Sequence, residues 1–447
     1  MTYQETVAYL FDVTPVFEHV GASAYKEGLS NTRALDAHFG HPHRAYKTIH
    51  VAGTNGKGSC SHALAAILQQ AGYRVGLYTS PHLVDFRERI HVNGEPISEE
   101  RVVDFVATER AFFEPLHPSF FEFTTALALL YFKEQRVDVA VIEVGLGGRL
   151  DCTNIITPEL SVITNISMDH TQFLGDTLAK IAGEKAGIIK KGVPVVVGET
   201  HPETRPVFEA KAREMGAPIV FADDRPEVLS FGTCVTGGCN YLTRSHGPLH
   251  GELGGTYQAK NTNTVLWAID LLRGTATIGN PASSPQPCPY PAAPFVVSED
   301  NIHQAFAHIT DTTGLCGRWQ TLRTQPLVVC DTGHNVGGWQ YLAPQIKAQP
   351  CHTCRMVFGM VDDKDIDTVM QLLPKDATYY WAQASSKRAI PTAVVAAKGA
   401  RHQLHGRDCG TVAEAYQAAM ADARPDDFVF VGGSSYIVSD LLSLNDF

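Results

Sequence analysis

The chain has 447 residues, enough for two or three domains of about 150 residues, each with a sizeable core. Hydrophobic residues make up 44% of it, which excludes a wholly disordered chain. The formal net charge of −11 argues against non-specific nucleic-acid binding but is compatible with local basic pockets for anions.

We expect neither a membrane segment nor an export signal in this chain. No run of about 18 apolar residues occurs, and the N-terminal stretch MTYQETVAYLFDVTP lacks the basic-then-apolar pattern of a signal peptide. We therefore expect a cytoplasmic protein with no membrane partner, whose ten cysteines are reduced thiols. Cys351 and Cys354 have metal-like spacing, and Cys234 with Cys239 could complete a four-sulfur zinc site. A single C-x-x-C pair is weak evidence, so free cysteines are the favoured interpretation.

Predicted strands and helices alternate from residue 46 to about residue 220. The predicted strands are KTIHVAG, YRVGLYT, VDVAVIEVG, LSVITNI, GVPVVVG and APIVFA. The expected helices cover residues 57–71, 178–189 and 203–215. Near-continuous apolar strands separated by helices indicate an α/β fold with a doubly wound, mostly parallel sheet.

A second α/β series follows two irregular segments. Residues 228–250 read as a small β-rich excursion, and the Pro/Ser/Ala-rich stretch 274–297 as an irregular surface loop. The strands PLVVCDTG, RMVFGM, ATYYWAQA and DFVFVGG then alternate with helices over 336–348, 366–373 and 412–423. We predict one domain over 1–315 and a smaller, Rossmann-like domain over 316–447. In open α/β sheets ligands bind beyond the carboxyl ends of strands, so motifs there carry the most weight.

The segment HVAGTNGKGS, residues 50–59, lies where a predicted strand meets a predicted helix. It departs from the common phosphate loop G-x-x-x-x-G-K-[ST], because Val51 replaces the first glycine and Gly58 separates Lys57 from Ser59. Its three glycines still let backbone N–H groups approach an anion, the lysine can contact phosphate, and the serine can reach a magnesium ion. The alternative is a simple strand–turn–helix junction with a surface lysine. The combination of features favours phosphate binding.

The spelling GTNGKGS resembles the phosphate loop of Mur-ligase-like amide ligases, and in particular of the folylpolyglutamate synthase/dihydrofolate synthase branch. Further matching segments follow in the same order: TSPHL, RERIHVNGEPIS, FFEFTT, EVGLGGRLDCTN, SMDHTQFLGDTLAKIAGEKAGIIK, CGRWQ, DTGHN and DDKD. The similarity covers nearly the whole chain and is most specific over 143–190. It implies an ATP-dependent ligase that activates a carboxylate as an acyl phosphate and transfers it to the amine of L-glutamate. The acid would be dihydropteroate, the γ-carboxyl of a reduced folate, or both.

Three other functions remain open on sequence grounds. A ligase of the same architecture could act on another carboxylate, such as a cell-wall precursor, although GTNGKGS and SPHL argue against it. A P-loop phosphotransferase or NTPase would release ADP without needing an amino acid. A catalytically dead ATP-binding module would lack metal ligands, whereas candidates for these are present.

The resemblance implies two Mg²⁺ ions, and leaves room for a monovalent cation. Their ligands would be Ser80, Glu143, His170 and a carbamylated Lys185, formed with CO₂. Taken alone, an acid at a strand end could form a structural ion pair, a single histidine is more often structural, and a helical lysine is usually solvated. The same resemblance gives Lys57, Lys185 and His170 catalytic roles.

The resemblance also implies residues for the nucleotide. Its phosphates would be held by Thr54, Asn55, Gly56, Lys57, Gly58 and Ser59, with Arg318 as a further phosphate contact. Its adenine would contact Asn261, and its ribose would contact Asp331, with His334 nearby. A carboxylate that accepts ribose hydroxyls is physically reasonable. The chain departs from the family pattern in the adenine pocket, with Tyr257 where the family often has histidine and Gly333 where it often has alanine.

The acid substrate would contact residues from three segments. These are Gly28, Leu29, Phe121, Glu122, Arg149, Leu150 and Asp151. Phe120 and Phe121 could stack on a flat heterocycle or could be core residues. The implied partners are small molecules, namely dihydropteroate, reduced folates and L-glutamate, with no nucleic acid, and the chain would act as a monomer.

Overall fold

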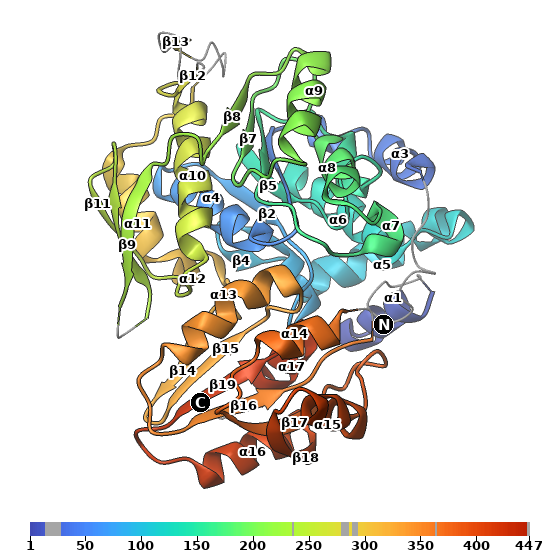
Figure 1. Cartoon of the computed structure of the whole chain (residues 1–447). Helices are drawn as coiled ribbons and strands as arrows, with labels where there is room; N and C mark the ends of the chain where they lie inside the picture. Colours follow the sequence, from blue (N-terminus) through green and yellow to red (C-terminus); the bar gives the residue numbers. More distant parts are fainter. Residues whose placement is uncertain (14–27, 235–236, 279–285, 288–293, 363, 445–447) are drawn as a thin grey trace.

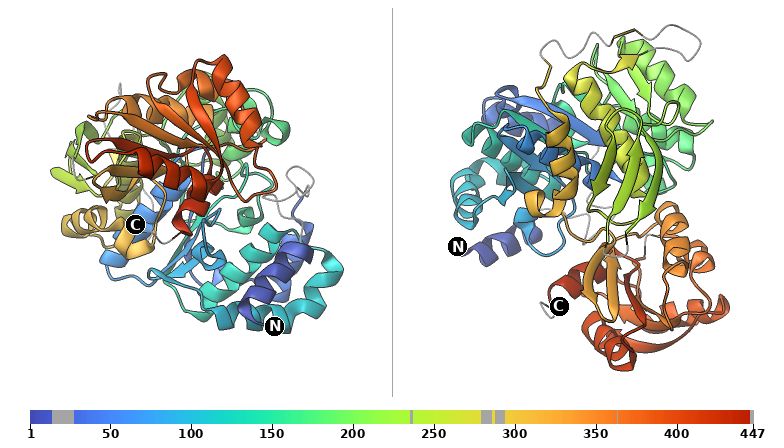
Figure 2. Two further views of the ribbon diagram at one scale, coloured as in Figure 1. Left: turned by 90° about the horizontal axis from the view of Figure 1, so that it is seen from below. Right: turned by 90° about the vertical axis from the view of Figure 1, so that its left-hand side faces the viewer.

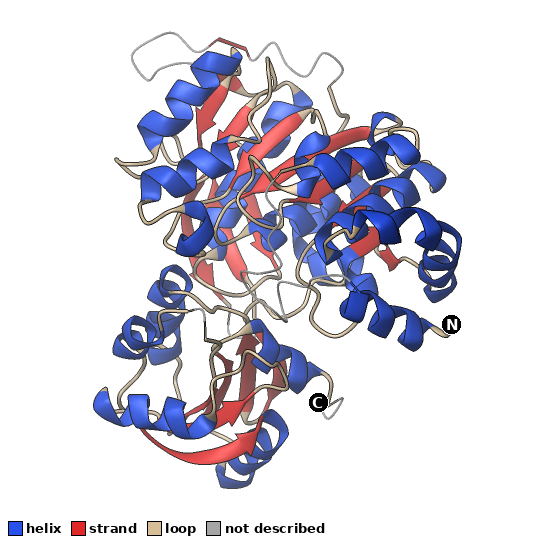
Figure 3. Ribbon diagram, turned by 90° about the vertical axis from the view of Figure 1, so that its right-hand side faces the viewer, coloured by secondary structure: helices blue, strands red, loops and turns tan. Residues whose placement is uncertain are grey.

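The computed structural model describes residues 1–13, 28–234, 237–278, 286–287, 294–362 and 364–444. These residues form two large sheets with helices on both faces of each (Figures 1 and 3). The first sheet lies in the blue-to-yellow part of Figure 1 and the second in the orange-to-red part. The right-hand view of Figure 2 shows the second sheet and its helices as a distinct part of the molecule.

The first sheet has eight strands in the order β4-β3-β2-β5-β1-β6-β7-β8. The strands are β1 Lys47–Ala52, β2 Val75–Tyr78, β3 Ile90–Val92, β4 Glu95–Pro96, β5 Val139–Glu143, β6 Leu160–Ile163, β7 Val195–Val197 and β8 Ile219–Phe221. Six strands run parallel, and β3 and β4 add an antiparallel hairpin at one edge. The predicted mostly parallel sheet is therefore confirmed.

Both faces of the first sheet are buried, which explains its near-continuous apolar strands. Along β5, Val139 and Val141 join the core on one face, whereas Ala140 and Ile142 join the core on the other. Successive side chains of a strand point to opposite faces, so a strand that is covered on both faces is apolar at most of its positions.

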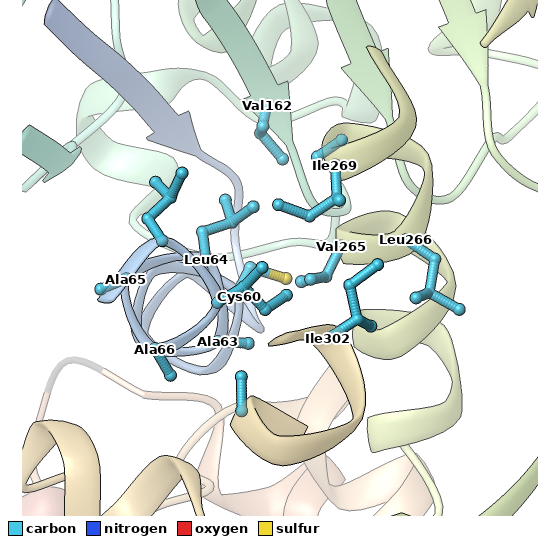
Figure 4. Packing of buried hydrophobic residues seen from close by; sticks show 14 of the residues in the cluster. Cys60, Ala63, Leu64, Ala65, Ala66, Val162, Val265, Leu266, Ile269 and Ile302 are labelled. Atoms are coloured by element: carbon cyan, nitrogen blue, oxygen red, sulfur yellow. The ribbon is translucent and has the colours of Figure 1, made fainter. Parts of the chain in front are cut away.

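The helices and 3-10 turns of this part cover those two faces. They are α1 Tyr3–Val13, α3 Ser30–His38, η2 Pro42–Arg44, α4 Lys57–Gln70, η3 Phe86–Arg89, α5 Glu99–Phe113, η4 Glu114–Leu116, α6 Phe120–Glu134, η5 Cys152–Ile155, α7 Thr171–Leu174, α8 Leu178–Ala186, α9 Arg205–Met215, α10 Gln258–Arg273, α11 Glu299–Ala307 and α12 Ile309–Thr313. Figure 4 shows Cys60 and Leu64 of α4 packed against Val265 and Ile269 of α10. Helix α4 is thus buried between the sheet and other helices, which fixes the loop that precedes it.

The second sheet has six strands in the order β14-β15-β19-β16-β17-β18. They are β14 Gln320–Thr324, β15 Leu327–Asp331, β16 Cys354–Phe358, β17 Thr378–Gln383, β18 His405–Thr411 and β19 Phe428–Gly432. Its helices are α13 Val336–Lys347, α14 Ile366–Leu372, α15 Thr392–Arg401, α16 Val412–Asp422 and α17 Ser435–Leu442. All neighbouring pairs are parallel except β14 with β15. The expected second, smaller α/β unit is confirmed.

The predicted β-rich excursion is a three-stranded antiparallel sheet of order β11-β10-β9. Its strands are β9 Val228–Thr233, β10 Cys239–Thr243 and β11 Pro248–Gly251. The predicted loop 274–297 contains the short pair β12 Thr277–Ile278 and β13 Gln286–Pro287, and its residues 279–285 and 288–293 lie outside the described residues. Helix α15 and strand β18 follow the predicted strand ATYYWAQA and precede the predicted helix 412–423, and neither was predicted from the sequence.

The structure describes nine of the cysteines. All nine cysteines among the described residues are free, and that part of the chain holds no group of three or more His, Cys, Asp or Glu arranged to bind a metal. Within the same residues, no helix combines the length and apolar character needed to cross a membrane.

A buried histidine ties the small antiparallel sheet to two helices. His246 Nδ1 lies 2.9 Å from Glu299 Oε2 at the start of α11, and its Nε2 lies 3.4 Å from Asp270 Oδ2 on α10. Burial opposes the charge on the ring, but the two carboxylates outweigh burial and raise the pKa of His246 to about 9. A histidine whose pKa rises on folding stabilises the protein below its unfolded pKa, and this contribution is lost as the pH rises through the folded pKa.

We therefore expect stability to fall between about pH 6.5 and pH 9 because His246 loses its proton. Since Glu299 is half exposed, we expect the loss to be about 1 to 2 kcal/mol, less than the full linkage value. Urea unfolding at pH 6, 7.5 and 9 measures it, and His246→Gln should flatten the dependence. An unchanged slope in that variant would contradict the assignment.

Candidate active site

The segment 50–59 forms a tight loop between β1 and α4. Gly53 and Gly56 have φ values of 147° and 84°, a region that glycine tolerates best. A Cβ at Gly53 would lie 1.9 Å from Thr164 Oγ1, so close packing on the end of β6 also requires glycine there. The Nζ of Lys57 donates to the carbonyl oxygens of Gly53 at 3.2 Å and Thr54 at 3.1 Å. The lysine is thus held over a helix N-terminus, the arrangement that binds phosphate.

The residues after β6 hold this loop in place. Thr164 Oγ1 donates to the carbonyl of Asn55 at 2.6 Å, and Asn165 Oδ1 accepts from the Asn55 N–H at 2.9 Å. These contacts fix the loop backbone before any ligand arrives. Neither residue has a role predicted from the sequence, although both lie in the predicted strand LSVITNI.

Glu143 lies at the carboxyl end of β5, next to the loop. Its side chain is 2% exposed, and its Oε2 accepts from the Ser80 backbone N–H at 3.4 Å. Burial raises the pKa of Glu143 to about 6, although Lys57 and Arg318 partly oppose the rise. A Cβ added at Gly58 would lie 3.4 Å from Arg318 Nη2 and 3.9 Å from Glu143 Oε2. The carboxylate and the guanidinium therefore both lie against the start of α4.

Lys185, on α8, is 4% exposed, in contrast to a solvated helical lysine. Its Nζ donates to the carbonyl of Gly53 at 2.8 Å, so it contacts the phosphate loop directly. Burial, with a further contribution from Lys57, lowers the pKa of Lys185 to about 7. Much of this side chain is therefore a neutral amine near neutral pH.

The structure places His170 at the start of α7, with φ of 48°. Its Nε2 lies 3.9 Å from Asp169 Oδ1. Asp169, in turn, accepts from Lys364 Nζ at 2.6 Å and from Asn335 Nδ2 at 2.9 Å. Burial acts to raise the pKa of Asp169, but the hydrogen bond from His334 and the charge of Lys364 hold it well below its usual range.

Asn335 also joins the two parts of the molecule at the loop itself. It exchanges two side-chain hydrogen bonds with Asn55, at 2.9 and 3.1 Å. The contacts of the phosphate loop and Asp169 with the second part thus include His334, Asn335 and Lys364. Asp169, Asn335 and Lys364 have no predicted role, although each lies in a segment that matches the family (MDH, DTGHN or DDKD). Spatial proximity across 160 or more residues is not visible in one sequence.

The donors near the loop fit magnesium better than a metal that needs many protein ligands. Glu143 supplies a buried carboxylate, and the Ser80 backbone already lies beside it. Mg²⁺ is typically held by one or two carboxylates together with substrate phosphates and water.

The remaining predicted nucleotide residues lie on both sides of the loop. A Cβ at Gly56 would lie 2.3 Å from Asn261 Oδ1, so Asn261 packs directly on the loop. Asp331 accepts from Tyr257 OH at 2.6 Å and from the Gly333 N–H at 2.7 Å. The two departures from the family pattern therefore meet at the predicted ribose carboxylate. Arg318 hydrogen-bonds Thr332 beside it.

Several of the predicted acid-substrate residues lie in or against the turn after β5. A Cβ at Gly145 would lie 2.5 Å from Phe121 Cζ, so the ring lies on the turn. Arg149 pairs with Glu184 of α8 at 2.9 Å, and Asp151 caps η5. Leu150 lies between them in the same turn, and Gly28 and Leu29 directly precede α3.

Glu122 has a structural contact that the sequence analysis did not foresee. It is 3% exposed and accepts from the Ser119 N–H at 2.7 Å, which completes a capping box at the start of α6. Its substrate-binding role stays a prediction, as do the roles of the other site residues.

Two family models match the chain. The Mur ligase middle domain matches residues 51–220, and the Mur ligase, glutamate ligase domain matches residues 317–435. The fold and site thus define a Mur-type, ATP-dependent ligase. The dihydrofolate synthase/folylpolyglutamate synthase of Bacillus subtilis is 32% identical over 93% of this chain and 94% of its own length. The chain belongs to the dihydrofolate synthase/folylpolyglutamate synthase family.

Solved structures agree with this assignment. Escherichia coli FolC in complex with DHPP and ADP aligns with a TM-score of 0.80 and 31% identity, over 100% of this chain and 98% of that one. A bifunctional folylpolyglutamate synthase/dihydrofolate synthase with Mn, AMPPNP and L-glutamate bound aligns with a TM-score of 0.78 and 29% identity, with 100% and 98% covered. The chain spans 50% of the length of a Haloferax volcanii relative named a probable bifunctional folylpolyglutamate synthase/dihydropteroate synthase, at 33% identity.

Proposed function

We propose that this chain uses ATP to join L-glutamate to dihydropteroate, to the γ-carboxyl of a reduced folate, or to both. One observation carries the proposal. A single glycine-rich loop at the carboxyl ends of parallel strands is surrounded by four charged side chains, those of Lys57, Glu143, Lys185 and Arg318. Relatives that carry this activity by name, and a related structure with L-glutamate bound, support the choice of substrates.

The reaction that we propose has two steps. A carboxylate oxygen of the acid attacks the γ-phosphorus of ATP, which gives an acyl phosphate and ADP. The glutamate amine then attacks the acyl carbon, and phosphate leaves with the bonding electron pair while the amine loses a proton. Lys57 and Arg318 stabilise the negative charge that develops on the phosphoryl oxygens, since phosphoryl transfer depends mainly on positioning and electrostatics.

In this proposal Glu143 and its partner ligand His170 would hold Mg²⁺, with the Ser80 hydroxyl as a further ligand of the first ion. A carbamylated Lys185 would bind the second ion. Bound Mg²⁺ neutralises phosphate charge and orients the transferred group. Carbamylation needs a neutral amine, and the lowered pKa of buried Lys185 supports it. We also propose a monovalent cation at this site.

We further propose that residues 1–315 and 316–447 act as two domains of a cytoplasmic monomer. Candidate residues from both segments contact the loop within one chain, which supports a site that needs no second copy. Asn261 would face adenine and Asp331 the ribose. The acid would lie along Gly28, Leu29, Phe121 and the turn that carries Arg149, Leu150 and Asp151.

An ADP-release assay tests the proposal. Purified protein is offered ATP and Mg²⁺ with dihydropteroate or tetrahydrofolate, each with and without L-glutamate. We expect sustained ADP release only when an acid and glutamate are both present. Release without an amino acid would indicate a phosphotransferase or NTPase, and release only with a cell-wall precursor acid would indicate another Mur-type ligase.

A further inference from the structure

A buried series of hydrogen bonds connects β1, the strand before the phosphate loop, to the turn 145–151, which carries three of the predicted acid-substrate residues. His50 lies on β1, three residues before Gly53, and is fully buried. Its Nε2 lies 2.8 Å from Thr153 Oγ1 on η5. Thr153 Oγ1 in turn donates to Asp151 Oδ1, and Asp151 Oδ2 accepts from the Leu146 N–H at 2.9 Å. This series of hydrogen bonds thus runs from β1 to the backbone of the turn after β5.

The direction of these hydrogen bonds fixes the state of His50. Because Thr153 donates its only hydroxyl hydrogen to Asp151, its oxygen must accept a hydrogen bond from the Nε2–H of His50. Burial, with a smaller effect of Lys190, lowers the pKa of His50 to about 3, so the ring is neutral at physiological pH. Its Nδ1 is buried without a hydrogen-bond partner. A cost of this kind is expected only where the other nitrogen makes a contact worth keeping.

The turn 145–151, which these hydrogen bonds hold, packs its backbone against the backbone of α8. The Arg149 N–H donates to the carbonyl of Glu184 at 2.8 Å, and a Cβ at Gly187 would lie 2.4 Å from Arg149 Cα. A Cβ at Gly148 would lie 3.1 Å from Lys185 Cα. The turn is therefore held on one side by the helix of Lys185 and on the other by β1, through His50.

We propose that His50 is a positioning residue for the acid substrate. Acting through Thr153 and Asp151, it fixes the turn 145–151 relative to the phosphate loop, so that the reacting carboxylate and the γ-phosphate meet at a set distance. This inference rests on the proposed function, because it assigns the turn to the acid. The histidine itself touches neither substrate.

His62 provides a matched control. It is also a buried histidine with a pKa lowered to about 3 by burial, and its Nδ1 lies 2.8 Å from the hydroxyl of Thr313. It lies on α4, however, and its partner lies on α12, away from the turn. His50→Leu and His62→Leu therefore remove the same kind of buried hydrogen bond from two different places.

The test compares KM values and amide exchange in the full chain. We expect His50→Leu to raise the KM for the pteridine acid about tenfold, the effect of a lost buried hydrogen bond, with the KM for ATP changed less than about twofold. His50→Gln, which keeps a hydrogen-bond donor, should bring the KM for the acid most of the way back to the wild-type value. Adding Thr153→Val to His50→Leu should raise this KM little further, because both residues act through the same hydrogen bonds. His62→Leu should leave the KM for the acid unchanged.

Hydrogen exchange gives a readout that does not depend on activity. In His50→Leu the amide of Leu146 should exchange faster than in the wild type, while amides of the phosphate loop keep their protection. Equal KM changes for acid and ATP, or unchanged exchange at Leu146, would overturn the proposal. A wild-type protein that released no ADP with any acid and glutamate would instead contradict the proposed function, and the exchange result would still decide the role of His50.

Discussion

Replacing Glu143 by alanine is expected to lower kcat about a hundredfold to a thousandfold, the usual effect of removing one strong electrostatic contact from a transition state. The carboxylate is buried at the end of β5, beside the Ser80 backbone and the first turn of α4. Without it, the proposed magnesium would lose its main protein ligand. Steady-state ADP release at saturating ATP measures kcat, and a Mg²⁺ titration should show a weaker apparent affinity.

The Glu143 variant should remain folded, because the wild-type carboxylate carries a desolvation cost that raises its pKa to about 6. Asp223 is a suitable control. Asp223 follows the carboxyl end of β8, as Glu143 lies at the carboxyl end of β5. Asp223 Oδ2 accepts from the Thr200 N–H at 2.8 Å and from the Thr200 hydroxyl at 2.6 Å. Asp223→Ala should cost stability but keep the Mg²⁺ dependence of the wild type. A Glu143→Ala enzyme with near-normal kcat would contradict the assigned metal site.

Replacing Lys185 by alanine is expected to reduce kcat by a similar factor, because the side chain is buried against the phosphate loop. If the wild-type lysine is carbamylated, its effect depends on a carboxylate, and added formate or acetate should partly restore activity to the variant. Steady-state rates with and without the small acid measure the rescue. Lys185→Arg, which keeps a cation but cannot be carbamylated, should stay inactive.

Lys180, on the same helix, provides the matched control for Lys185. Its side chain is 63% exposed and pairs with Asp176 at 2.8 Å, so Lys180→Ala should leave kcat unchanged. A ¹³C NMR spectrum of wild-type protein in labelled bicarbonate should show one carbamate signal that Lys185→Ala lacks. An unmodified lysine in active, ATP-saturated enzyme would contradict carbamylation, and loss of activity without rescue would leave only an electrostatic role for the amine.

The sequence alone determined the elements whose signals are local. The doubly covered strands β1, β5 and β6 are mostly apolar, and the loop 50–59 requires glycine where the backbone is left-handed or crowded. Such constraints act within a few residues, so the sheet, the loop and the strand-end Glu143 could be predicted. By contrast, β18, HGRDCGT, is an edge strand with mostly exposed side chains, and it carries no alternating or continuous apolar pattern.

Only the tertiary structure decided which distant residues meet. Asn55 and Asn335 are 280 positions apart and exchange two hydrogen bonds, and Asp169 and Lys364 are 195 apart and form an ion pair. The burial that lowers the pKa of Lys185 likewise depends on how α8 packs against the loop. Desolvation and ion pairing depend on everything that surrounds a group, whereas a sequence shows only its neighbours along the chain.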